Sequence, residues 1–189
     1  MFDYGLQIMV DLYMSKGITT TCIERNPPVM KPRFETKPEF SVLGMASYYT
    51  MSTANEIPKL WDDFIPAINN IEHKIGNHCY GVCDMPKDLP EGSDFRYTAC
   101  VEIEKKSKSI HEGMVVQIIP ANDYVVFTHK GPISKINKTY DYIYKEWLPK
   151  SEYSTKPFID FEFYGEKFNS ENPMDENSEV DIFVTLIKK

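Results

Sequence analysis

Apolar residues in the first part of the chain follow two spacings, one typical of strands and one typical of a helix. Residues 40–49 and 95–104 are rich in aromatic and β-branched side chains, and both segments predict strands. Between them, the apolar residues of 57–68 stand at helical spacing, and Pro66 within this run is expected to kink or end the helix. A short strand is predicted at 80–83.

The second part of the chain shows the same order of elements. Its predicted helix precedes Pro149, which is expected to end it because proline disfavours helical geometry in the preceding residue. One face of this helix is aromatic, with residues at i, i+3, i+4 and i+7, namely Tyr140, Ile143, Tyr144 and Trp147. Further strands are predicted at 113–119, 123–129, 160–164 and 180–187.

The two parts align with each other at an offset of 83 residues. Segment 60–66 lies over 143–149, and both read aliphatic, aromatic, two charges, aromatic, aliphatic, proline. The same offset lays 41–44 over 124–127 and 98–103 over 181–186. Any two strand-helix-strand units share some patterning, but seven consecutive matches ending in proline favour a duplication.

The duplication predicts an α+β fold of two β-α-β-β units related by a pseudo-two-fold axis. The units are expected at about 37–105 and 113–189, with an antiparallel sheet, two helices and a ligand groove between the halves. Residues 1–34 are interpreted as an N-terminal extension before a domain at 35–189. The extension either packs on the domain or a neighbouring chain, or is the remnant of a linker to another module.

Composition narrows the classes of function. The 189 residues are 42% hydrophobic and 13% aromatic, which is enough for one domain with a substantial core. A net charge of -7 without a basic cluster is atypical of nucleic-acid binding. No apolar run approaches the ~20 residues that span a bilayer, and no signal peptide is evident. We therefore expect a cytoplasmic protein that contacts neither nucleic acid nor membrane directly.

The four cysteines do not predict a metal site or a disulfide framework. They are spread through the chain at positions 22, 79, 83 and 100. His78 and Cys79 with Cys83 resemble one ligand pair, but zinc sites usually need a second pair, which is missing. Buried thiols are the simpler interpretation, and no metal or cofactor is predicted.

Glu162 is the strongest candidate for a functional side chain. It lies between Phe161 and Phe163, and Lys167 is the only nearby basic residue in the sequence. A buried carboxylate is costly without a partner, so a bound organic cation could supply the positive charge. Aromatic neighbours are expected from both halves: Tyr144, Trp147, Tyr164, Tyr48, Tyr80 and Tyr97. The alternatives are core packing for the rings, and a solvent-facing or salt-bridged position for Glu162.

Four segments together resemble the GyrI-like small-molecule-binding family, the effector-binding domain of AraC-type activators such as Rob and of MerR-type multidrug regulators. The segments are 125–131, 136–140, 143–149 and 161–164, and the resemblance extends over about 36–189. It implies a duplicated fold and an aromatic groove that binds hydrophobic, often cationic compounds. By motif position, Glu162 is the acid of that groove, with Trp147 and Tyr164 as neighbours. No DNA-binding domain is evident, so a stand-alone member is expected.

Three functions remain open from the sequence. The favoured one is a stand-alone multidrug sensor or sequestering protein for hydrophobic or cationic small molecules. The second, implied by the resemblance, is a hydrolase of strained cyclopropane-type toxic compounds; no catalytic residue is assigned, because the histidines at 73, 78, 111 and 129 show no nucleophile partner. The third is a protein-interaction module of the gyrase-inhibitor type. A protein partner or a homodimer stays open.

Overall fold

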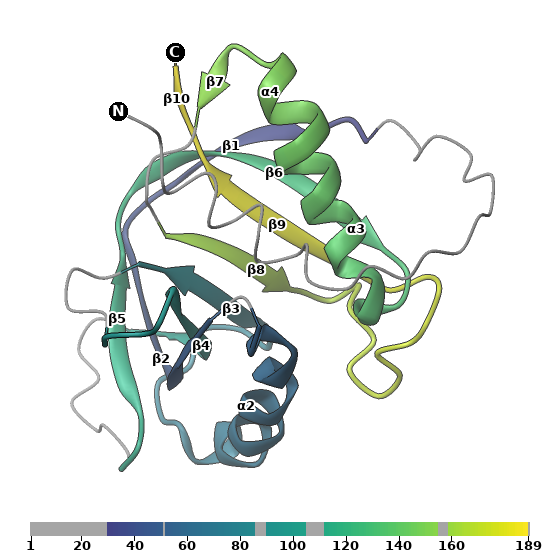
Figure 1. Ribbon diagram of the computed structural model, residues 1–189. Coiled ribbons are helices and arrows are strands. Elements are labelled where there is room, and N and C mark those ends of the chain that lie inside the picture. The colour runs from purple at the N-terminus through teal and green to yellow at the C-terminus, as the bar shows by residue number, and fades with distance from the viewer. Residues whose placement is uncertain (1–29, 51, 86–89, 105–111, 155–158, 189) are drawn as a thin grey trace.

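The protein folds around one eight-stranded antiparallel sheet with helices on one of its faces (Figure 1). The computed structural model describes residues 30–50, 52–85, 90–104, 112–154 and 159–188. Within these residues the strand order is β1-β6-β9-β8-β3-β4-β2-β5. The predicted α+β class with an antiparallel sheet and two helical segments is confirmed. Residues 1–29 of the predicted N-terminal extension lie outside the described residues.

The first half supplies one end of the sheet and the helix that covers it, while its first strand, β1, pairs with β6 at the other end. Its elements are β1 (Arg33–Lys37), β2 (Phe40–Tyr49), η1 (Ala54–Glu56), α2 (Ile57–Phe64), η2 (Ile65–Asn70), β3 (Cys79–Asp84), β4 (Phe95–Ile103) and β5 (Val115–Ile119). As predicted, Pro66 marks the change from α-helix to a 3-10 turn, because proline cannot donate the helical hydrogen bond. Phe64 is the fully buried residue of α2.

The second half supplies the other end of the sheet. Its elements are β6 (Asn122–Lys130), η3 (Ile133–Lys135), α3 (Ile136–Asp141), the π-helical η4 (Tyr142–Trp147), α4 (Leu148–Lys150), β7 (Tyr153–Ser154), β8 (Asp160–Tyr164), β9 (Glu179–Thr185) and β10 (Ile187–Lys188). The helix ends at Lys150, one residue after Pro149. In Figure 1, the green helix from α3 to α4 lies over β6 and β9, while α2 lies by the strands of the first half.

The two halves meet where β3 pairs with β8. Tyr80 lies opposite Phe163 in this pair, and these residues are also 83 positions apart, so the seam agrees with the proposed offset. The alignment of 41–44 over 124–127 is wrong by one residue. Leu43 and Val125 both face the helices, and 125 − 43 gives an offset of 82. A one-residue slip turns every side chain of a strand to the opposite face, so burial settles the register where sequence similarity did not.

The sheet curls strongly around its helix-free face. β5 and β6 lie near opposite ends of the strand order, yet only residues 120–121 connect them. Three Cα–Cα steps, from Ile119 to Asn122, span at most about 11 Å, so the two ends of the sheet must approach each other. A core in which half of the buried residues are aromatic fills the inside of the curl and joins residues from both ends of the sheet, namely Phe40, Val42, Tyr80, Val82, Cys100, Ile119, Tyr124, Val126, Phe161 and Phe183.

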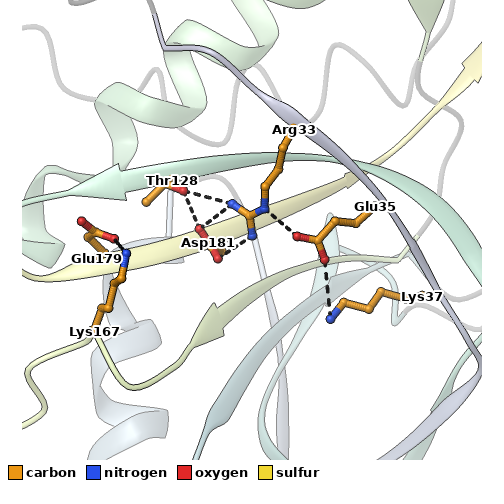
Figure 2. Close-up of polar contacts among 7 residues, drawn as sticks. All are labelled: Arg33, Glu35, Lys37, Thr128, Lys167, Glu179 and Asp181. Atoms are coloured by element: carbon orange, nitrogen blue, oxygen red, sulfur yellow. Dashed lines mark hydrogen bonds and ion pairs between the residues drawn. The ribbon is translucent and has the colours of Figure 1, made fainter.

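The edge strand β1 is held to the sheet by a bidentate ion pair. Figure 2 shows the Arg33 guanidinium bound to both carboxylate oxygens of Asp181, at 2.7 and 3.1 Å, with Thr128 donating to the same carboxylate. Burial alone would raise the pKa of Asp181, but the hydrogen bonds from Arg33 and Thr128 hold the pKa below its usual value. The pair therefore joins β1 to β9 across the intervening strand β6.

Candidate functional site

Glu162 lies in the middle of β8, at the seam between the halves, and its side chain accepts three tyrosine hydroxyl hydrogen bonds. Tyr97 and Tyr164 donate to Oε2 at 2.7 and 2.8 Å, and Tyr140 donates to Oε1 at 2.9 Å. Trp61 in turn donates its indole N–H to the Tyr97 oxygen at 3.2 Å. We call these five residues the Glu162 cluster.

The alternation of side chains between the two faces of β8 directs Glu162 toward the helices. Phe161 and Phe163 belong to the core inside the curl, so the intervening carboxylate points to the opposite face. The Glu162 cluster draws on both halves: Tyr97 comes from β4 and Trp61 from α2, whereas Tyr140 comes from α3. A tertiary arrangement of the two repeats is therefore required to assemble it.

Gly81 makes room for the carboxylate. It lies directly opposite Glu162 in the β3–β8 pair. A Cβ added at Gly81 would lie 2.6 Å from Glu162 Oε2 and nearer still to the Tyr97 hydroxyl. No ordinary carbon–oxygen contact is that short, so the hydrogen bond between Tyr97 and Glu162 requires the absence of a side chain at position 81.

The electrostatic state of Glu162 reflects burial opposed by hydrogen bonding. Only 6% of Glu162 is exposed, and this burial raises its pKa, while the three hydroxyl donors act in the opposite direction. Within the described residues, the lysine and arginine ion pairs are all made with other acids. The site thus holds a carboxylate whose charge is solvated by hydroxyl dipoles and is not neutralised by any lysine or arginine of the described residues.

A second tyrosine–carboxylate pair, Tyr144 with Asp160, lies two residues from Glu162 along β8. Tyr144 donates to Asp160 Oδ2 at 2.8 Å, and the backbone N–H of Thr185 donates to Oδ1 at 2.8 Å. The rings of Tyr140 and Tyr144 are parallel, with centroids 6.4 Å apart, which matches the ~6.6 Å between alternate residues of a strand. Burial raises the pKa of Asp160 to about 6 despite these donors.

The structure brings only some of the expected aromatic residues to Glu162. Tyr97 and Tyr164 bind it directly, and Tyr144 binds the neighbouring Asp160. The remaining three expected residues lie elsewhere: Trp147 packs on Phe127 and Tyr153, Tyr80 lies in the core inside the curl and donates to Glu102, and Tyr48 is 41% exposed.

Three members of this arrangement were not among the expected site residues: Tyr140, Trp61 and Gly81. Tyr140 was visible as the first residue of the aromatic helix face, four positions before Tyr144. Trp61 occupies the position equivalent to Tyr144 in the repeat alignment. No sequence signal distinguished Gly81, because its importance arises from the cross-strand partner Glu162.

Other site types receive no support from the described residues. Within them, no group of three or more His, Cys, Asp or Glu side chains is placed to hold a metal ion. Cys79, Cys83 and Cys100 are free thiols, and burial raises the pKa of each. In the same residues, no helix is both long and apolar enough to cross a membrane.

The family of the chain follows from a sequence comparison. A family model described as the GyrI-like small molecule binding domain matches residues 30–187. The chain belongs to this GyrI-like family. The match includes β1 and both repeats, and it assigns the chain to a family of small-molecule-binding domains.

One curated relative of this GyrI-like chain is a regulator. Transcriptional regulator BrlR of Pseudomonas aeruginosa is 36% identical over an alignment of 162 residues that covers 83% of this chain and 56% of BrlR. The chain therefore spans little more than half the length of that relative.

Solved structures share the fold at low sequence identity. SAV2435 bound to tetraphenylphosphonium has a TM-score of 0.67 at 15% identity, covering 84% of this chain and 94% of SAV2435. The EcmrR C-terminal domain has a TM-score of 0.61 at 18% identity, covering 85% of this chain and 99% of the domain. At such identities the likeness establishes the fold alone.

Proposed function

We propose that this GyrI-like domain binds lipophilic organic cations at the Glu162 cluster and serves as a ligand sensor or sequestering module. One observation carries the proposal: Glu162 is almost fully buried at the seam of the duplicated fold, and the three groups that donate hydrogen bonds to it are neutral tyrosine hydroxyls. Hydroxyl donors stabilise a negative charge without cancelling it, so the site retains an attraction for a positive ligand.

The aromatic rings beside Glu162 add a second reason. Tyr164 and Trp61 are partly exposed and contact each other edge to face, with centroids 5.1 Å apart. A cation over such rings gains about 0.5–2 kcal/mol per good contact, with the larger values where water is excluded. A ligand with both apolar surface and positive charge would benefit from the rings and the carboxylate together.

The relatives agree with this choice of ligand and role. SAV2435, which shares the fold, was solved bound to tetraphenylphosphonium, a lipophilic cation. BrlR is a transcriptional regulator, and the region it shares with this chain makes up only 56% of BrlR. A sensing role for this chain would require a further module or a separate partner, whereas a sequestering role would not.

Hydrolysis is a weaker explanation of the same residues. A general base must offer a lone pair to the attacking water. In Glu162, both lone pairs of Oε2 and one of Oε1 already accept tyrosine hydroxyls. This arrangement suits a fixed negative charge better than a group that must accept a proton.

Calorimetric titration with tetraphenylphosphonium and with the neutral analogue triphenylphosphine oxide tests the proposal. Glu162→Gln should weaken phosphonium binding at least about tenfold, because it removes the buried charge, and should change binding of the neutral analogue less than about twofold. Glu102→Gln is the matched control, since Glu102 accepts a hydroxyl from Tyr80, which lies outside the Glu162 cluster.

Fluorescence provides an independent check of location. In a Trp147→Phe variant, Trp61 is the remaining tryptophan, and it lies within the Glu162 cluster. Tetraphenylphosphonium should quench its emission with the affinity found by calorimetry. Unchanged phosphonium affinity in Glu162→Gln, or binding without an effect on Trp61, would refute the proposed site.

A further inference from the structure

We infer that the Glu162 site selects for cations that carry no N–H donor, such as quaternary ammonium and phosphonium ions, over protonated amines of the same skeleton. This inference rests on the proposed function, because it assumes that cations bind at Glu162. It assigns to Tyr97, Tyr140 and Tyr164 a role in specificity: they occupy the carboxylate acceptors that a protonated amine would otherwise use.

The acceptor capacity of Glu162 is nearly filled within the protein. A carboxylate offers about four lone-pair positions, two on each oxygen. Tyr97 and Tyr164 both donate to Oε2, and Tyr140 donates to Oε1, so about one position is left by the part of the chain that the structure describes. The Tyr97 oxygen also accepts the indole N–H of Trp61, which reduces its capacity to accept a second donor.

The two classes of cation lose different amounts of hydration on entering such a site. A primary ammonium is a compact, strongly hydrated charge with three N–H donors, and each donor needs a new partner when it leaves water. A quaternary ammonium or a tetraarylphosphonium has no N–H donor, and its charge is covered by carbon. It can be attracted by the charge of Glu162 and by the rings without forming a hydrogen bond.

This preference would not follow from a bare carboxylate. A carboxylate with open lone pairs binds an ammonium through charge-assisted hydrogen bonds, which are among the strongest in proteins. With the lone pairs engaged by tyrosines, that advantage is lost, whereas the long-range attraction remains. The selection therefore depends on the hydroxyl groups, not on the rings that carry them.

The test compares (4-phenylbutyl)trimethylammonium with 4-phenylbutylammonium, both charged at neutral pH, by calorimetric titration. The wild-type protein should bind the trimethylammonium ion at least about tenfold more tightly, which is the scale of penalty for one or more donors left without a partner. The additional methyl groups also contribute to the ratio of the two association constants, trimethylammonium over ammonium. The decisive quantity is therefore how much this ratio changes between variants.

Tyr164→Phe keeps the ring but removes one donor to Oε2, and Tyr140→Phe does the same for Oε1. Each should lower the ratio at least about threefold, because the freed lone pair can accept an ammonium N–H. Tyr124→Phe is the matched control: Tyr124 lies inside the curl of the sheet, and its hydroxyl has no hydrogen-bond partner among the described residues. Its ratio should equal that of the wild type.

The outcomes distinguish a failure of this selectivity inference from a failure of the proposed function on which it rests. A lower ratio in both site variants, with Tyr124→Phe unchanged, supports selection by the hydroxyls. If tetraphenylphosphonium binding depends on Glu162 but the ratio is the same in wild type, Tyr164→Phe and Tyr140→Phe, the selectivity inference is wrong and the proposed function stands. If none of the cations binds the wild-type protein, both are overturned.

Discussion

A methyl group at Gly81 should disrupt the Glu162 cluster by steric overlap with its side chains. In Gly81→Ala, the new Cβ would lie 2.6 Å from Glu162 Oε2 and nearer still to the Tyr97 hydroxyl oxygen. The strand backbone is fixed by pairing on both sides, with β4 and β8, so the two side chains must move instead. We expect the 2.7 Å hydrogen bond between Tyr97 and Glu162 to break.

The size of the effect follows from three contributions. Overpacking of a well-packed site costs about 1–3 kcal/mol, and a hydrogen bond to a buried charged group contributes about 1.5–3 kcal/mol. The loss of glycine flexibility in the unfolded chain offsets about 0.4–1 kcal/mol of this. The free energy of unfolding of Gly81→Ala should therefore fall by about 1.5–5.5 kcal/mol.

Denaturant unfolding of a double-mutant cycle with Tyr97→Phe is the assay. Removing the Tyr97 hydroxyl also removes the atom nearest to the new methyl group, so Gly81→Ala should cost at least about 1 kcal/mol less when it is combined with Tyr97→Phe than in the wild-type protein. Additive effects within about 0.5 kcal/mol would show that the methyl group is accommodated elsewhere. The predicted steric contact between Gly81 and the Glu162 cluster would then be refuted.

Two further predictions concern pH and the edge strand. Burial raises the pKa of Asp160 to about 6 in the folded protein, so between about pH 4 and pH 6 the folded protein holds a proton that the unfolded chain has lost. The free energy of unfolding should therefore fall as the pH rises through this window. Asp160→Asn should reduce that slope in urea unfolding between pH 4 and pH 8. Arg33→Ala should lower the free energy of unfolding by about 1 kcal/mol or less, because its ion pair with Asp181 is partly exposed, and should accelerate amide exchange in β1. Lys167→Ala is the control, since the Lys167 side chain is 77% exposed, and it should change neither quantity. Equal exchange rates in both variants would contradict the assigned role of Arg33.

The order of elements was accessible from the sequence because local rules govern it. Helical spacing before Pro66 and Pro149, and the strand-like segments around each helix, identified two similar units. The strand β1 was not predicted, since Phe34 is the single hydrophobic residue among its five and none of them is buried. It is held to the sheet instead by pairing with β6 and by the ion pair of Arg33 with Asp181, which are 148 positions apart in the sequence.

The candidate site was predictable in its centre and only in part in its surroundings, since Tyr97 and Tyr164 were expected but Tyr140 was not. Glu162 stood out as an acid between two phenylalanines. Which tyrosines reach it depends on the alternation of β3, β4 and β8 and on their register, and this places Tyr97 beside Glu162 but puts Tyr80 on the opposite face. Trp147 belongs to the same helix as Tyr140, yet the π-helical turn and the packing on Phe127 direct it away from the seam.

The amino-acid sequence alone determined two β-α-β-β units and one exceptional carboxylate, because periodicity and proline positions act over a few residues. Only the tertiary structure decided which groups surround that carboxylate, because strand register and helix docking join residues that are 22 to 65 positions apart, as the bonds from Tyr140 and Tyr97 to Glu162 show. The same long-range pairing placed Gly81 opposite Glu162, where the absence of a side chain leaves space for the hydroxyls.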